Sequence, residues 1–466
     1  MDARGCNSQL QWASQVLPFR PRGDAVTAHS TRRDPMSKGL AVLNRIASMP
    51  VLDRLNLRHP SEQVAYHGAR VGFRTAGAVS RGFRRVPGRG APVRPTAAPT
   101  TGVFDLTPTE DQQMMVDVVA EFAREVVIPA VEKAETALDT PADLFTQAYE
   151  LGLTLTGLPE DLGGLAAERS ATTGALVAEA LGRGDMGIAA SLLAPGSVAT
   201  AIGLWGDSTQ QATYLPAFTG SDVPAAALAV AEPRALFDPF GPRTTARSVP
   251  GGGFVLDGVK SGVIRGASAE LFVVAATTDD GRPALFVLES STPGITIETD
   301  PSMGLRAAAL SRLVLDGVTV PAEALLPESI TSYADSVRLA RIAWSSLAVG
   351  AMRAVLDYVI PYVKERKAFG EPVAHRQSVA FMVADMATEL EGARLATLRA
   401  ASRADLGRSF AREAALSRRL CTEYGMKIGT DGVQLLGGHG FTKEHPVERW
   451  YRDLRAVGVM EGGLLV

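Results

Sequence analysis

The hydrophobic pattern of this 466-residue chain changes twice along its length, and these changes limit the folds open to it more than any other feature. Apolar residues recur at helical spacing over residues 103–220 and again after residue 327. Between these stretches, short segments rich in β-branched residues alternate with turn signals such as the Pro-Gly-Gly-Gly of residues 250–253. The order predicts a mainly α fold with a small antiparallel β domain at its centre.

The same pattern divides the chain into four predicted regions. They are a basic N-terminal extension and linker (1–102), an N-terminal helical domain (103–221), a middle β domain (222–328) and a C-terminal helical domain (329–466). Helices are expected at 142–150, 171–181, 336–365, 377–406 and 412–436. Strands are expected at 225–231, 254–259, 271–276, 284–288, 295–298 and 312–315.

Two local signals refine the N-terminal helical domain. Thr107 can cap a helix with Pro108 in its first turn, and Glu110 then completes a capping box. The uncharged run 186–206 is long enough to span a bilayer, which takes ~20 mostly apolar residues. The Pro-Gly pair near its middle, however, predicts a buried helix, a break and a second helix rather than a membrane span.

The charge is divided unequally along the chain. The formal net charge of −3 combines +11 over residues 1–100 with −14 over the rest. An acidic main body argues against nucleic-acid binding, which needs a basic stripe. The Arg-rich extension lacks the apolar core of a secretory signal, although mitochondrial transit peptides share its composition.

Short basic helices are expected over residues 36–86, and two roles stay open for them. They pack on the main body, or they contact a membrane surface or a partner. Residues 1–35 are either unstructured or precede a natural start at Met36.

Cysteine and histidine usage gives no sign of a metal site or a disulfide framework. Cys6 and Cys421 are too few for such a framework. The six histidines lack the Cys/His spacing of a zinc site, so no metal is expected. A reduced, cytoplasmic setting is the simplest interpretation.

Three segments contain residue types that could bind a ligand or take part in a reaction. The Gln-Leu-Leu-Gly-Gly-His-Gly-Phe of residues 434–441 could let backbone N–H groups approach an anion or a flat ligand, or it could simply end a helix. The Glu-Arg-Lys-Ala-Phe-Gly of residues 365–370, with Gln377, combines a cationic fork, an aromatic ring and an amide that suit a pyrophosphate, or it is an exposed helix end. Glu461 is a single carboxylate beside glycines.

Taken together and in this order around a β domain, these segments resemble the acyl-CoA dehydrogenase family over residues 103–466. Supporting matches are Pro-Glu-Asp-Leu-Gly-Gly (159–164), Ala-Glu-Pro (231–233), Val-Thr-Val-Pro-Ala-Glu (318–323) and Glu-His-Pro-Val-Glu-Arg (444–449). The resemblance implies an N-terminal helical domain, a middle β-barrel or sandwich domain and a C-terminal four-helix bundle, assembled as tetramers built from dimers.

The resemblance also implies the reaction, an FAD-dependent α,β-dehydrogenation of an acyl-CoA to the trans-2-enoyl-CoA, with electron-transfer flavoprotein as acceptor. Glu461 would be the α-proton base, because the family's other base position holds Ala340 here, and its backbone N–H would be an oxyanion donor. Arg341 falls at the acyl-CoA site. The implied FAD contacts face a neighbouring subunit and are Arg366, Phe369, Gln377, Gln434, Gly437 and Gly438.

The chain departs from the family on the other side of the flavin. Ala231 replaces the Thr of Thr-Glu-Pro, residues 236–241 replace Gly-Ser-Asp, residues 262–264 replace Trp-Ile-Thr, and Gly463 replaces a Thr. We expect the loss of three hydroxyls and the Trp to weaken flavin binding at the chain's own site by on the order of 3–6 kcal/mol.

These departures give the hypothesis that the chain pairs with a homologous subunit, as in the hetero-oligomeric enzymes of actinobacteria, and lends its FAD contacts to that subunit. The alternatives are a homotetramer that holds its own FAD, an acyl-CoA oxidase, and a non-catalytic structural or regulatory subunit.

Overall fold

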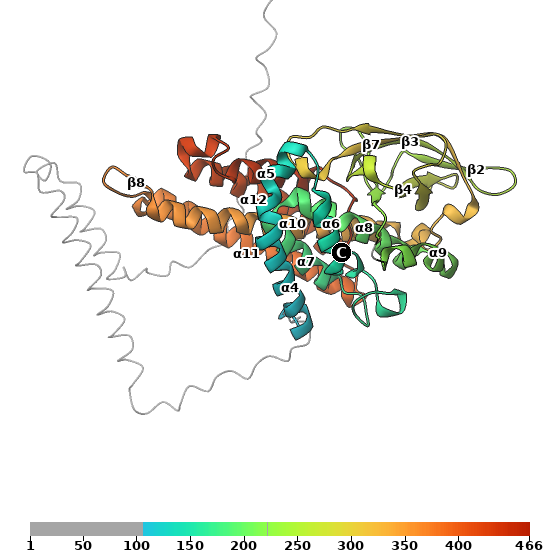
Figure 1. The fold of residues 1–466 in the computed structure, drawn as a ribbon, viewed down its shortest axis with the longest axis horizontal. Helices are drawn as coiled ribbons and strands as arrows, with labels where there is room; N and C mark the ends of the chain where they lie inside the picture. The colour runs from blue at the N-terminus through green and yellow to red at the C-terminus, as the bar shows by residue number, and fades with distance from the viewer. Residues whose placement is uncertain (1–105, 221) are drawn as a thin grey trace, which may run out of the picture. The chain divides into compact units, whose positions relative to one another are not determined.

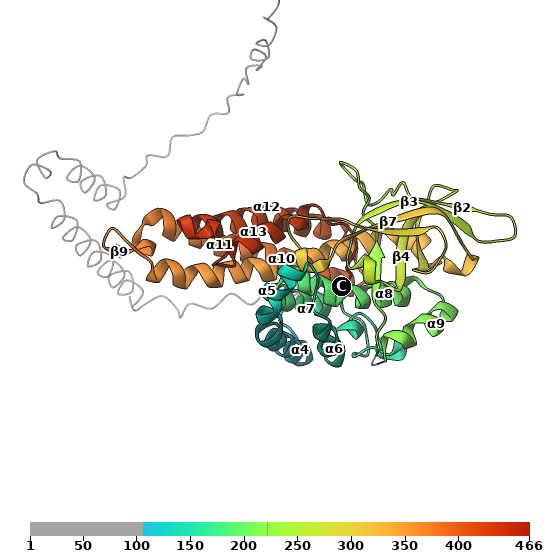
Figure 2. The same cartoon turned by 45° about the horizontal axis from the view of Figure 1, so that its top comes forward.

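The computed structural model describes residues 106–220 and 222–466, which form a helical region, a β region and a second helical region (Figure 1). The predicted extension and linker, with the helices expected over 36–86, lie outside the described residues. The sheet lies at one end of the helices in both views (Figures 1 and 2).

The first described helix, α4 (Glu110–Phe122), begins two residues later than predicted. Thr109 is the N-cap, and its hydroxyl accepts a hydrogen bond from the backbone N–H of Gln112 at 3.2 Å. The Gln112 side chain accepts one from the Thr109 N–H at 3.0 Å. The prediction of Thr107 and Glu110 as the capping pair was therefore wrong, because residues 109–112 offer the same motif.

The N-terminal helices pack around a largely apolar interior. After α4 they are the π-helix η1 (Ala123–Val127), α5 (Ile128–Ala137), α6 (Ala142–Glu150), the short 3₁₀ turns η2 (Leu153–Leu155) and η3 (Glu160–Leu162), α7 (Ala171–Gly184), α8 (Met186–Trp205) and α9 (Ser208–Phe218).

Helix α8 is continuous, so the predicted break at Pro195 was wrong. The helix is buried on nearly all sides, and this packing outweighs the one backbone hydrogen bond that a proline removes. Hydroxyls of Ser197 and Thr200 donate to helix carbonyls at 2.9 and 2.7 Å.

Helices α8 and α10 (Ser329–Glu365) are long and apolar enough to cross a membrane. However, 83% and 89% of the most apolar 18-residue stretch of each helix is buried within the protein.

The β region is a seven-stranded mixed sheet in the order β1-β4-β2-β3-β7-β6, with β5 also paired to β4. Its strands are β1 (Ala226–Ala229), β2 (Thr245–Ser248), β3 (Phe254–Val263), β4 (Leu271–Thr278), β5 (Pro283–Glu289), β6 (Ile295–Thr299) and β7 (Ser311–Val320). Strands β1 and β2 run parallel to β4, so the all-antiparallel prediction was wrong. A parallel pair needs a long crossover, and here the β3 strand provides it between β2 and β4.

Strand β4 lies between two apolar cores. Val273 and Ala275 face the helical core, while Phe272 and Val274 face a second core within the β region. Burial on both faces explains its unbroken apolar run. The β region is thereby fixed firmly to the helices.

The C-terminal region is built on three long helices that pack on one another, α10, α11 (Gln377–Asp405) and α12 (Ala411–Leu435), with the short α13 (Val447–Asp453) against α12. A two-stranded hairpin, β8 (Lys367–Ala368) and β9 (Glu371–Pro372), follows α10. The hairpin lies at the end of the helices remote from the sheet (Figure 2). Helix α10 starts seven residues before the predicted position.

Helices α7 and α10 approach each other closely at Gly350. A Cβ atom at Gly350 would lie only 2.1 Å from the backbone oxygen of Glu179, so no larger residue fits without movement. This close contact sets α10, which runs from the sheet to the hairpin, against the N-terminal helices.

Candidate active site

Glu461, the predicted base, lies in an ion pair with two arginines from different helices. Arg341 on α10 donates to both of its oxygens, from Nη2 to Oε1 at 2.9 Å and from Nε to Oε2 at 3.1 Å. Arg418 on α12 approaches Oε1 with Nη2 at 3.0 Å. Glu461 is only 8% exposed, so the three charges are largely withdrawn from water. The structure thus brings together the predicted base and the predicted acyl-CoA-site residue.

Arg418 was not predicted from the sequence. Besides Glu461, it donates to the carbonyl oxygens of Met460 at 2.8 Å and Gly458 at 3.2 Å. Burial lowers the pKa of its guanidinium, and the Glu461 carboxylate acts in the opposite direction. Arg418 follows the buried Ala414 by four residues, so its helical spacing placed it on the inner face. A cation on such a face is a signal for a buried anion.

The segment 236–241, which stands where the family has Gly-Ser-Asp, contacts this ion pair through Phe240. The Phe240 ring lies 5.0 Å from the Arg341 guanidinium carbon. The Tyr333 hydroxyl donates to the Pro239 carbonyl at 2.8 Å and holds the segment in place. The segment therefore offers an aromatic face to an arginine rather than a hydroxyl to a ligand.

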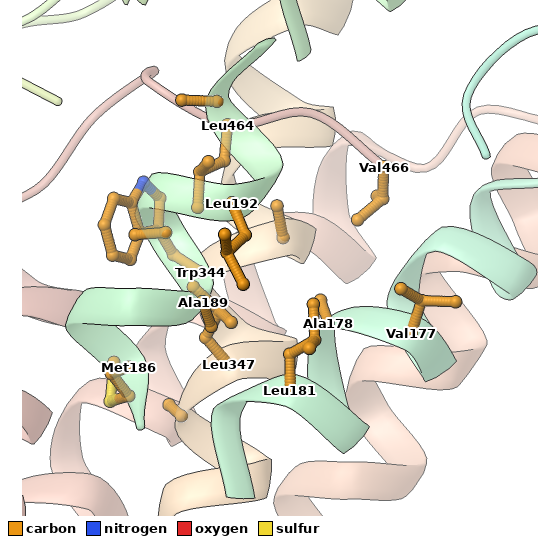
Figure 3. Close-up of a cluster of buried hydrophobic side chains, with 14 of the residues drawn as sticks. Val177, Ala178, Leu181, Met186, Ala189, Leu192, Trp344, Leu347, Leu464 and Val466 are labelled. Atoms are coloured by element: carbon orange, nitrogen blue, oxygen red, sulfur yellow. The ribbon is translucent and has the colours of Figure 1, made fainter. Parts of the chain in front are cut away.

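The chain after Glu461 is packed into the helical core (Figure 3). Trp344 Nε1 donates to the Gly462 carbonyl at 2.8 Å, and the Leu465 N–H donates to Ser197 Oγ at 2.9 Å. Leu464 is fully buried and lies beside Leu192 and Trp344 in the close-up. Residues 460–466 thus fill the space between α7, α8 and α10.

The residues that replace Trp-Ile-Thr do not fit the flavin contact of the family. Gly262 has φ +62, in a bulge of β3, where a Trp would be strained. A Cβ atom at Gly262 would lie 3.3 Å from the Met460 sulfur, and one at Gly463 would lie 3.2 Å from Ile264. Residues 460–463 therefore pack against the segment that stands in place of Trp-Ile-Thr.

A second site forms at the hairpin end of α10. It is a groove of about 350 Å³, and its lining includes Tyr362, Arg366, Gln434, Gly437, Gly438 and His439. A Cβ atom at Gly437 or Gly438 would meet nothing within 4 Å, so the backbone there is open to a ligand. The Arg366 side chain is exposed and forms no ion pair with the described residues. These groups fit the phosphates and adenosine of a dinucleotide.

Four of the six predicted FAD contacts meet in this groove, and two do not line it. Phe369 stands at the tip of the hairpin, 96% exposed, with the Arg376 guanidinium carbon 5.8 Å from its ring centre. Gln377 is exposed at the first residue of α11. The sequence did not single out Tyr362 as a groove residue, although its aromatic ring lies one helical turn before Arg366.

The two sites are far apart in one chain. Arg341 on α10 and Arg366, the C-cap of that helix, are 25 residues apart, which corresponds to about 38 Å at 1.5 Å per residue. One FAD molecule is too short to contact both.

A buried ion pair holds the Ala-Glu-Pro segment. Lys260 is fully buried and donates to Glu232 at 3.1 Å and to the Val230 carbonyl at 3.3 Å. Burial lowers the pKa of Lys260 to about 8. Burial also opposes ionisation of Glu232, but Lys260 and the N–H groups of Thr244 and Arg243 outweigh it and hold the pKa of Glu232 below its ordinary value.

Comparison with known proteins identifies the fold and the chemistry. Family models of acyl-CoA dehydrogenase match the N-terminal domain over residues 109–222, the middle domain over 227–318 and the C-terminal domain over 332–463. Cyclohex-1-ene-1-carbonyl-CoA dehydrogenase of Geobacter metallireducens is 34% identical over 366 residues, which are 76% of this chain and 95% of that protein.

Solved structures show the same similarity. Butyryl-CoA dehydrogenase from Megasphaera elsdenii superposes with a TM-score of 0.71 and 29% identity, covering 77% of this chain and 96% of that one. A glutaryl-CoA dehydrogenase from Mycobacterium smegmatis in complex with FADH2 superposes with a TM-score of 0.70 and 27% identity. The match covers 76% of this chain and 92% of that one. The predicted resemblance and fold class are confirmed. The chain belongs to the acyl-CoA dehydrogenase family, whose members use FAD to dehydrogenate acyl-CoA thioesters.

Proposed function

We propose that this chain is a subunit of an acyl-CoA dehydrogenase assembly and lends its groove to FAD seated in the β domain of a homologous partner. One observation carries the proposal: residues 460–463 pack against the segment that replaces Trp-Ile-Thr in this chain's β region, while the groove at the other end of α10 is open. FAD supplies the hydride acceptor of the reaction when bound. The partner would keep the Trp-Ile-Thr segment that this chain lacks.

The chemistry of the groove supports this role. Arg366 offers a guanidinium that can donate two parallel hydrogen bonds to phosphate oxygens. Gly437 and Gly438 leave room for a ligand to approach the backbone N–H groups directly. Gln434 adds an exposed amide at the rim. The groove therefore suits the pyrophosphate half of the cofactor.

In this assembly Glu461 acts as an anchor for residues 460–466, and the partner's own site performs proton removal. Both oxygens of Glu461 accept N–H donors from Arg341, and Arg418 shares one of them. To take a substrate proton, the carboxylate would have to leave those donors. The acyl-CoA substrate and electron-transfer flavoprotein would then dock at the partner's site.

A second candidate function keeps Glu461 as the catalytic base of this chain. One observation favours it: the backbone N–H of Glu461 finds no acceptor among residues 106–220 and 222–466, as expected of an oxyanion donor waiting for a thioester. In that case, substrate binding must draw Arg341 and residues 460–466 out of their present positions.

The test uses the full chain co-expressed with an acyl-CoA dehydrogenase chain that keeps Trp-Ile-Thr. Arg366→Ala should lower FAD affinity of the complex by about tenfold to a hundredfold, because a hydrogen bond to a charged group contributes ~1.5–3 kcal/mol. Arg419→Ala, an exposed arginine on α12 outside the groove, is the matched control. Equal FAD content in both variants would contradict the lending role.

The Glu461→Gln variant separates the two candidate functions in the same complex. Turnover per bound FAD should stay within about twofold of the wild type if Glu461 is an anchor. A loss of two or more orders of magnitude per bound FAD would assign the base to this chain instead. Dividing by bound FAD removes any effect of the substitution on assembly.

A further inference from the structure

We propose that His439, Glu444 and His445 form a binding site for a divalent metal ion of the zinc type. Each residue offers one ligand atom, and the three atoms lie within 4.8 Å of one another. The residues belong to the loop between α12 and α13. The inference rests on these side chains alone and does not depend on the lending of FAD.

The ligand set is suited to zinc. Two imidazoles and one carboxylate form a ligand set that Zn²⁺ accepts in tetrahedral geometry, with a fourth position left for water or another ligand. Bonds of ~2.0–2.1 Å in a tetrahedron bring ligand atoms to about 3.4 Å from one another. His439 and Glu444 are both exposed, so closing the remaining gap of at most about 1.4 Å needs only rotation of exposed side chains.

His445 is already held in one orientation. Its Nδ1 lies 2.6 Å from the hydroxyl oxygen of Tyr358. The rings of Tyr358 and Tyr362 pack edge-on against its imidazole, with ring centres 5.9 and 5.7 Å away. When Nδ1–H donates to Tyr358, the lone pair of Nε2 is free for a metal. A hydrogen bond to the second ring nitrogen is the usual support of a metal-bound histidine.

The fold of the loop brings His439 back to His445. Gly440 is buried, and a Cβ there would lie 2.2 Å from the Val433 carbonyl, so the loop passes tightly over the end of α12. The Thr442 hydroxyl donates to the His439 carbonyl at 3.0 Å and closes the turn. The two imidazole rings are then 5.6 Å apart.

The remaining two side chains are available for a ligand. The side chains of His439 and Glu444 form no hydrogen bond or ion pair within the described part of the chain. The spacing of these residues differs from that of a zinc finger, so sequence alone predicted no metal. Because His439 also lines the groove, a bound ion would fix the loop that carries Gly437 and Gly438.

The experiment is titration of the full chain with ZnCl₂, followed by calorimetry, and with Co²⁺, followed by visible absorption. His29, His59 and His67 lie outside the described residues and are changed to Gln in the parent chain, which leaves His375 as the remaining histidine away from the site. We expect one tight Zn²⁺ per chain and a Co²⁺ spectrum of tetrahedral type.

His439→Ala and Glu444→Gln should each weaken Zn²⁺ binding at least tenfold, and both positions are exposed, so the fold is not at risk. Tyr358→Phe should weaken it about tenfold to a hundredfold through His445. His375→Ala, an exposed histidine paired with Glu371, should have no effect. Binding that survives His439→Ala and Glu444→Gln unchanged, or no tight Zn²⁺ in the parent chain, would overturn the proposal.

Discussion

The ion pair at Glu461 predicts how strongly this carboxylate contributes to the stability of the fold. Glu461→Gln keeps the size of the side chain but removes the negative charge between Arg341 and Arg418. The side chains of these arginines are 16% and 15% exposed, so water cannot readily replace the lost partner. The substitution should therefore destabilise the fold rather than leave it unchanged.

The size of the loss in unfolding free energy depends on the contacts that each arginine retains after the substitution. Removing one partner of a buried ion pair costs ~3–5 kcal/mol, because the other charge stays uncompensated. Arg418 retains the carbonyls of Met460 and Gly458, and Arg341 retains the ring of Phe240. We therefore expect a loss near the lower end, about 3 kcal/mol of unfolding free energy.

The assay is urea unfolding of the chain at pH 7, followed by circular dichroism and by tryptophan fluorescence. Glu423→Gln is the matched control, because Glu423 is 58% exposed and pairs with Arg419 on the surface of α12. That control should change stability by less than ~1 kcal/mol. If Glu461→Gln costs no more than Glu423→Gln, the carboxylate is not an anchor and the reasoning fails.

Two further predictions concern the rest of the fold. Lys260→Met removes an ammonium whose pKa burial lowers from 10.5 to about 8. Between these values the unfolded chain binds more protons than the folded one, so the stability of the wild type relative to the variant should rise as the pH goes from 8 to 10. Urea midpoints across this range test it, and a flat or falling difference would contradict it. Gly350→Ala, which sets a methyl group against the backbone of Glu179, should cost ~1–3 kcal/mol. Gly392→Ala on α11 has open space and should instead stabilise by up to ~1 kcal/mol, and similar melting temperatures for the two variants would rule out the close α7–α10 contact.

The sequence predicted most of the helices and strands because their patterns are local. Helix α6 begins and ends where the apolar spacing indicated, and five strands contain the expected segments in full. Strand β2 was missed because Ala246 is its one buried residue, so it has no alternating pattern. It forms because β3 and β4 pair with it, which is a tertiary effect that local patterns do not reveal.

The candidate site was predictable in its residue types but not in its contacts. The motif positions of Arg366, Gly437 and Gly438 were enough to expect a common surface, and the groove brings them together. The pairing of Glu461 with Arg418 joins residues from separate elements, so the spacing of residues in the sequence does not predict it. The positive φ of Gly262 follows from a bulge whose register is set by β7.

The most direct test of the lending role is the amount of FAD bound per chain. The full chain is purified alone and together with a co-expressed acyl-CoA dehydrogenase chain that keeps Trp-Ile-Thr, and flavin absorbance is compared with protein concentration. We predict almost no flavin on the lone chain and one FAD for each pair of chains in the complex. One FAD per chain on the lone protein would contradict the proposal.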